Sequence, residues 1–227
     1  MKTKKSGFTL AEVLVSLMII GVIAGVTIPG LISSSEQKEN IAGCKKAYST
    51  LANAVNLAEQ ANGPVKRWGL KDPTTATDFD TFLAPYLNIA KKCSNSTGCF
   101  GEGTFKKYSG QTYSDLTTTG YGSPRYAFKL ADGMNVAYDV YPASYIYPAS
   151  FGAKVNLTTF FYFFVDVNGD KAPNTLGKDI FIFVETSDGL KPAGADNNSA
   201  DCGNGSAGTE CAAMVIKYSD MNYDKHR

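Results

Sequence analysis

The feature that most constrains this chain is an apolar segment that begins at Phe8 and ends at Ile32. It contains a single charged residue, Glu12, close to its start. The 24 residues from Phe8 to Leu31 would form an α-helix about 36 Å long at 1.5 Å per residue. That length is enough to cross the hydrocarbon core of a bilayer, which is about 30 Å thick. The segment is therefore predicted to span a membrane.

The residues before this segment indicate its orientation. Lys2, Lys4 and Lys5 precede the apolar run, and the positive-inside rule then places the N-terminus in the cytoplasm and the rest of the chain outside it. A cleaved secretory signal is the alternative. It is less favoured because a signal has an apolar region of only about 7–15 residues, and a glutamate near its start is unusual.

Glu12 needs an explanation of its own. A carboxylate at the centre of a helix in hydrocarbon costs roughly 2.5–3.5 kcal/mol or more, so an intramembrane carboxylate is a functional candidate by default. A plain anchor gains nothing from this charge, and we expect the assembled state to neutralise it. The simpler alternative is that Glu12 reaches the lipid headgroups.

The sequence Gly-Phe-Thr-Leu-Ala-Glu at residues 7–12 resembles the prepilin cleavage and methylation motif of type IV pilins and type II secretion pseudopilins. The resemblance implies that a prepilin peptidase cuts after Gly7 and methylates the new amine of Phe8. It makes Glu12 the fifth residue of the product, with a role in assembly. Pro29 also lies where pilin helices often carry a proline.

The resemblance further implies a structural subunit that leaves the bacterial inner membrane for a helical filament, with other pilin or pseudopilin subunits as partners. The alternative within the family is a minor pilin that acts as an adhesin or as a ligand- or DNA-binding module. A single-pass protein with its C-terminal domain outside the cytoplasm is expected in either case. The choice between a pilus, a secretion pseudopilus and a DNA-uptake filament stays open.

The pattern along the chain predicts four parts. They are a cleaved leader at residues 1–7, a membrane-spanning or filament-core helix at 8–32, an amphipathic continuation at 33–63 and a globular head at 64–227. The continuation carries apolar side chains at spacings of three and four, which indicate one buried helix face that ends at Gly63-Pro64. These side chains are Ile41, Cys44, Tyr48, Leu51, Val55 and Ala58.

The head is predicted to be α+β, with the long N-terminal helix packed on an antiparallel sheet of four or five strands. A second helix is expected near residues 76–89, bent or broken at Pro85. Alternation of apolar residues on both sides of Asp132-Gly133 predicts a hairpin. Further strands are expected at 158–165, 179–184 and 212–218, and the prolines of residues 141–150 predict a loop.

Five cysteines constrain the exported domain. Cys93 and Cys99 flank one short polar loop, and Cys202 and Cys211 flank another. An oxidising compartment then favours two local disulfides, Cys93–Cys99 and Cys202–Cys211, although cross-pairing between the loops stays open. Cys44 lies on the helical stripe and is expected to be a buried free thiol.

Composition and motifs argue against catalysis and against nucleic acid. Removal of residues 1–7 changes the side-chain charge from +1 to −2, and the rest of the chain has no basic cluster. His226, next to the end, is the only histidine, and no Cys-x2-Cys spacing occurs, so zinc and triad chemistry are not indicated. The Gly-x-Gly at 101–103 follows no strand–helix pattern. A non-enzymatic protein is expected.

One loop suggests a cation. Asp166, Asn168 and Asp170 alternate as at the start of a calcium loop of the Asp-x-Asn-x-Asp-Gly type. The loop departs from that type because its glycine, Gly169, comes before Asp170 instead of after it, and because Gly177, not glutamate, is the twelfth residue. Asp179 could supply the late ligand, which makes calcium a candidate cofactor. The alternative is a polar β-connection whose aspartates cap backbone N–H groups.

Overall fold

The computed structural model describes residue 7 and residues 9–70, 77–93, 98–99, 104–113, 126–142, 151–155, 157, 159–197 and 199–226. The chain divides into two compact units, Met1–Glu39 and Asn40–Arg227. Helix α1, Leu10–Asn62, contributes residues to both units, and Pro29 lies inside it. It ends directly before Gly63-Pro64, where the sequence predicts its end.

In the first unit, α1 presents apolar side chains on all sides. Leu10, Met18 and Val26 each expose more than 70% of their surface. An 18-residue window of the helix has a mean hydropathy of 2.3, and none of that window is buried. By length and composition this helix could cross a membrane.

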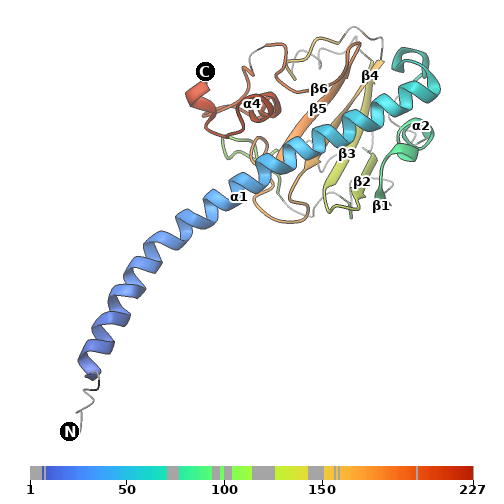
Figure 1. Cartoon of the computed structure of the whole chain (residues 1–227). Helices are drawn as coiled ribbons and strands as arrows, with labels where there is room; N and C mark the ends of the chain where they lie inside the picture. Colours follow the sequence, from blue (N-terminus) through green and yellow to red (C-terminus); the bar gives the residue numbers. More distant parts are fainter. Residues whose placement is uncertain are drawn as a thin grey trace. The chain divides into compact units, whose positions relative to one another are not determined.

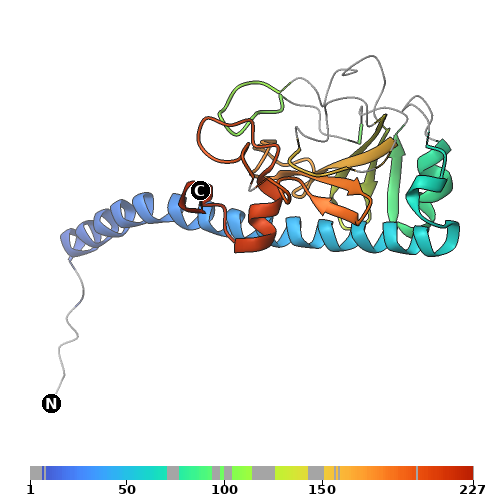
Figure 2. The ribbon, with the colours of Figure 1, turned by 90° about the horizontal axis from the view of Figure 1, so that it is seen from above.

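The second unit is built on a six-stranded sheet in which each strand pairs antiparallel with the next in sequence, in the order β1-β2-β3-β4-β5-β6. Figures 1 and 2 show the second-unit part of α1 lying along one face of this sheet. The fold is therefore α+β, as predicted. The strands are β1 Ile89–Cys93, β2 Tyr126–Leu130, β3 Asn135–Pro142, β4 Thr159–Asp166, β5 Ile180–Thr186 and β6 Gly189–Pro192.

Both faces of the central strands are buried, which explains why β4 is almost continuously aromatic. Phe161 and Phe163 lie in the core cluster that contains α1. Phe160 and Phe164 lie in a second cluster, on the opposite face. A strand covered on both faces loses the polar alternation of a half-exposed strand. The predicted helix stripe is the other half of the first cluster, with Cys44, Leu51, Val55 and Ala58 buried and Ile41 and Tyr48 partly buried.

Polar contacts attach α1 to three separate parts of the second unit. Lys46 Nζ lies 2.9 Å from the Asp132 carboxylate in the β2–β3 turn. Lys45 Nζ donates a hydrogen bond to Ser219 Oγ at 2.6 Å. Tyr48 OH donates one to the Leu190 carbonyl at 3.2 Å. These contacts fix the register of the helix over the sheet.

A glycine allows the closest approach of α1 to the sheet. A Cβ placed on Gly43 would lie 2.9 Å from Val167 Cβ and 3.1 Å from its Cγ2. Real Cβ atoms do not approach this closely, so a larger residue would push α1 off the end of β4. The loop that follows β4 therefore packs directly under the first second-unit turns of α1.

One charged side chain interrupts the apolar core. Glu185 follows Phe181 and Phe183 on alternate positions of β5, so it lies on the same face as those two side chains, toward α1. It is fully buried, and neither carboxylate oxygen has a hydrogen-bond partner among the residues that the structure describes. Burial, with a smaller contribution from Glu59 on α1, raises the pKa of Glu185 to about 9.

The predicted second helix is shorter than expected. It appears as α2, Thr77–Phe82, followed by the 3₁₀ turn η2, Ala84–Tyr86, so it breaks at Pro85 as anticipated. Residues 143–150 of the predicted proline-rich loop and 101–103 of the Gly-x-Gly lie outside the described part of the chain.

The prediction of a strand at 212–218 is wrong, because these residues form helix α4, Cys211–Tyr218. Its β-branched Val215 and Ile216 favour a strand locally. The fold buries Cys211, Ala212, Met214 and Val215, which share one helical face. The sheet also has one strand more than predicted, since β1 and β6 were not expected and the last predicted strand is absent.

Candidate functional site

The start of α1 is held by three hydrogen bonds between Thr9 and Glu12, which run in both directions. Thr9 N and Thr9 Oγ1 donate to Glu12 Oε2 at 2.8 and 2.9 Å, and Glu12 N donates to Thr9 Oγ1 at 3.3 Å. This is a capping box, which satisfies two backbone donors at a helix N-terminus. Glu12 therefore has a local role that the sequence reasoning missed, although the Thr-x-x-Glu pattern is its usual signal.

The residues at the predicted cleavage point precede this cap. Gly7 is exposed, and no other described atom lies within 4 Å of the position that a Cβ would take. Phe8 lies outside the described residues. Gly7 and Thr9 are not helical, and α1 begins at Leu10.

The loop between β4 and β5 brings three of the four predicted calcium ligands together. The Asp179 carboxylate accepts hydrogen bonds from Thr175 N at 2.6 Å, Asn174 N at 2.8 Å and Asn168 Nδ2 at 3.1 Å. Asp166 Oδ1 accepts one from Asn168 N at 3.3 Å. Asp166, Asn168, Asn174 and Asp179 are called the carboxylate cluster below.

Asp170, the fourth predicted ligand, lies outside the carboxylate cluster. Both of its carboxylate oxygens accept hydrogen bonds from Lys129 Nζ, at 2.6 and 2.7 Å, and Asn135 Nδ2 donates to Oδ1 at 2.9 Å. These contacts hold the pKa of Asp170 below its ordinary value. Among the described residues, no group of three or more His, Cys, Asp or Glu side chains is arranged to hold a metal ion.

The electrostatics of the carboxylate cluster are unfavourable for two free charges. Asp166 and Asp179 are fully buried. Burial, followed by the nearby Asp179 charge, raises the pKa of Asp166 to about 8. Burial also raises the pKa of Asp179, against the opposing effect of the N–H groups of Thr175 and Asn174.

One amide oxygen of the carboxylate cluster is unmatched. Asn168 Oδ1 is buried and has no hydrogen-bond partner within the described residues. Asn174 is matched when its amide nitrogen faces the Lys171 carbonyl oxygen at 3.1 Å and Asp166 Oδ2 at 3.2 Å, since it then donates to both.

Both predicted cysteine pairs are disulfides in the structure, Cys93–Cys99 and Cys202–Cys211. Cys44 is a buried free thiol, and burial raises its pKa well above the ordinary value. A reactive thiolate is disfavoured at such a site. Cys44 is thus a packing residue of the α1 stripe.

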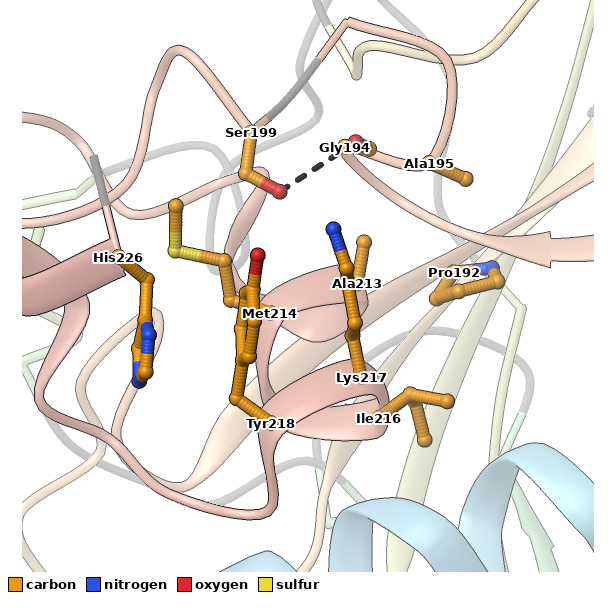
Figure 3. Close-up of a pocket in the computed structure, with 10 residues that line it drawn as sticks. All are labelled: Pro192, Gly194, Ala195, Ser199, Ala213, Met214, Ile216, Lys217, Tyr218 and His226. Carbon is orange, nitrogen blue, oxygen red and sulfur yellow. Dashed lines mark hydrogen bonds between the residues drawn. The ribbon is translucent and has the colours of Figure 1, made fainter.

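A pocket of about 440 Å³ lies beside α4 and was not predicted from the sequence. Figure 3 shows its lining, which comes from the end of β6 and the chain after it, from α4 and from the C-terminal 3₁₀ turn η4, Tyr223–His226. These segments follow one another within residues 192–226 and meet in the folded unit. The pocket also could not be predicted because residues 212–218, most of α4, were expected to form a strand.

The comparisons with known proteins identify the N-terminal segment alone. Residues 2–28 match the family described as the prokaryotic N-terminal methylation motif. No curated protein and no solved structure shows a significant match to the chain. The matched residues contain Gly7, the Thr9–Glu12 cap and most of the exposed apolar half of α1. The chain therefore carries the N-terminal methylation motif that is the signature of type IV pilin and pseudopilin precursors.

Proposed function

We propose that this protein is a structural subunit of a type IV pilus or a type II secretion pseudopilus. The observation that carries the proposal is the methylation motif at residues 2–28, joined to a helix whose first half exposes apolar side chains all round. Such a surface must be covered in water. Lipid covers it before assembly, and the helices of neighbouring subunits cover it in the filament.

The proposal assigns a sequence of events. The basic leader stays in the cytoplasm, a prepilin peptidase cuts after Gly7, and the second unit lies outside the inner membrane with its two disulfides. Its neighbours in the filament are copies of itself or related subunits. No catalytic step by this chain is part of the proposal.

The direct test compares hosts with and without the prepilin peptidase. In the native host we expect the protein in filaments that mechanical shear releases from the cell surface, or in the periplasmic pseudopilus when the machine is a secretion system. In the host that lacks the peptidase, we expect the full-length precursor to remain in the membrane. Equal amounts of filamentous protein in both hosts would contradict the proposal.

A minor subunit that binds a ligand is the second candidate, favoured by the pocket beside α4. Quantitative mass spectrometry of purified filaments separates the two roles. A main structural subunit is present in many copies per filament, whereas a minor subunit is present in few.

We also propose that the carboxylate cluster holds one calcium ion. Asp166 and Asp179 supply charged oxygens and Asn168 Oδ1 supplies a neutral one, and oxygen is the donor that a hard cation prefers. The two buried carboxylates and the unmatched Asn168 Oδ1 support this proposal. The bound ion would fix the loop that packs under Gly43 of α1.

The calcium prediction is tested by thermal unfolding of the full mature chain, in millimolar calcium or in excess chelator. Calcium at a hundredfold above its Kd stabilises the fold by about 2.7 kcal/mol, which raises Tm by roughly 5–10 °C for a domain of this size. Asp166→Asn should abolish this response. Asp170→Asn is the matched control and should keep it, because Asp170 pairs with Lys129.

Calorimetric titration with calcium at constant temperature gives a second readout that does not depend on the stability of the variants. A native chain with the same Tm in calcium and in chelator, and with no heat of binding, would leave the loop as a capped polar turn.

A further inference from the structure

The pocket beside α4 has the size and lining of a small-molecule site. Its volume of about 440 Å³ lies within the range of about 300–1,000 Å³ that is usual for ligand pockets. Met214 and Ile216 supply apolar surface, and Ser199, Lys217, Tyr218 and His226 supply polar atoms. The site is distinct from the carboxylate cluster and from the methylation motif.

One wall of the pocket is flat and fixed. The rings of Tyr218 and His226 stack with centroids 3.9 Å apart and planes 1° from parallel. His226 Nε2 also lies 2.9 Å from the Asp220 carboxylate, which holds the imidazole in place. Because the wall is already ordered, a ligand that packs beside it loses little additional side-chain entropy on binding.

Two donors at this wall have no hydrogen-bond partner among the residues that the structure describes. Figure 3 shows the Lys217 ammonium and the Tyr218 hydroxyl directed toward the same side of the pocket, below Gly194. In the described part of the chain, Lys217 has no ion pair; its Nζ lies 4.8 Å from the centre of the Tyr218 ring. Ser199 differs from them, since its hydroxyl donates to the Gly194 carbonyl at 3.3 Å.

The charge of the pocket favours a negative ligand. No aspartate or glutamate is among the described residues that line it. Asp220, the acid beside it, faces His226. A lysine in the last turn of a helix often does no more than stabilise the terminal carbonyls. Here its ammonium lines a cavity together with a hydroxyl donor, and a carboxylate could accept from both.

We propose that this pocket binds a small organic anion. Its carboxylate accepts hydrogen bonds from Lys217 Nζ and Tyr218 OH, and its apolar body packs on Met214 and Ile216. Hydrogen bonds between an ammonium and a carboxylate are stronger than those between neutral groups, so the ammonium carries much of the affinity.

The test is equilibrium dialysis with the full mature chain in lipid nanodiscs and with empty nanodiscs as the background. The probes are phenylacetate and indole-3-acetate, each compared with its neutral amide. We expect saturable binding of a carboxylate probe, and binding of its amide at least tenfold weaker. Lys217→Gln should weaken carboxylate binding roughly ten- to a hundredfold.

Two further variants make the test specific. Lys225→Gln is the matched control, because Lys225 is exposed in η4 but does not line the pocket, and it should leave binding unchanged. Tyr218→Phe keeps the ring and removes the hydroxyl. It should weaken the binding of the carboxylate probe without changing the binding of its amide. The proposal is overturned if neither carboxylate binds above the empty nanodiscs at millimolar concentration, if acid and amide bind equally, or if Lys217→Gln binds like the native chain.

Discussion

Replacement of Glu12 by glutamine is expected to leave the protein folded and processed, and to lower its incorporation into filaments about a hundredfold. After cleavage, the amine of Phe8 is a cation on an apolar helix. In the filament, Glu12 of one subunit would pair with the Phe8 amine of a neighbour. Removing one partner of a buried ion pair costs about 3–5 kcal/mol, because the other charge stays unpaired.

Glutamine is the informative substitution because it separates the two roles of Glu12. A capping box accepts either Glu or Gln at its third helical position, so Glu12→Gln keeps the bonds from Thr9 while removing the charge. Glu12→Ala removes both. If Glu12 only caps the helix, the glutamine variant should incorporate like the native chain and the alanine variant should incorporate less. If Glu12 only reaches the headgroups, both variants should incorporate like the native chain.

The measurement is the ratio of filamentous to membrane protein in sheared cells, normalised to the amount of processed chain. Glu36→Gln is the matched control, because Glu36 is another exposed glutamate of the first-unit part of α1. It should incorporate at the native level. Native-level incorporation of Glu12→Gln would show that assembly does not depend on an ion pair between Glu12 and the Phe8 amine.

Replacement of Glu185 by glutamine is expected to stabilise the fold by about 3 kcal/mol at pH 7. The pKa of Glu185 is raised to about 9 in the folded protein, against 4.5 for an ordinary glutamate. Between these two values the folded state keeps the proton and the unfolded state releases it. The folding stability that protonated Glu185 contributes at low pH is therefore lost as the pH rises from about 4.5 to about 9. Glutamine resembles the protonated acid and has no such loss.

The measurement is denaturant unfolding of the full mature chain at pH 5, 7 and 9. The stability difference between Glu185→Gln and the native chain should grow from small at pH 5 to its maximum near pH 9. The difference between the two unfolding free energies cancels the contribution of every group that titrates equally in both chains, and Asp166 is one of these groups. Asp188→Asn, at an exposed carboxylate in the β5–β6 turn, is the control and should show no such growth. A pH-independent difference for Glu185→Gln would contradict the buried, protonated assignment.

The parts of the fold that follow from local pattern were predictable. The stripe of α1 appears in the sequence because a helix that packs on one sheet repeats its apolar residues every three to four positions. The hairpin at Asp132-Gly133 and the long apolar β4 are also local signals. Strand β6 was missed because its four residues, Gly189–Pro192, include glycine and proline, which are rare in strands. These residues form a strand because they pair with β5.

The sites were predictable only where their residues are neighbours in sequence. The methylation motif is contiguous, and the two disulfides close short loops. The carboxylate cluster was found only in part: Asn174 joins it, and Asp170 leaves it for Lys129, 41 residues away. The choice between a cation and a lysine depends on the pairing of β4 with β3, which brings Asp170 to Lys129 and which no local pattern encodes. The pocket beside α4 depends on the packing of three separate segments within residues 192–226.

We propose that the chain is a precursor that is cut after Gly7 and methylated on Phe8 before assembly. The most direct measurement is the intact mass of the protein purified from its native host, from membranes and from filaments. We expect a mass that lacks residues 1–7 and carries one additional methyl group. A filament protein that retains residues 1–7, in a host with an active prepilin peptidase, would contradict it.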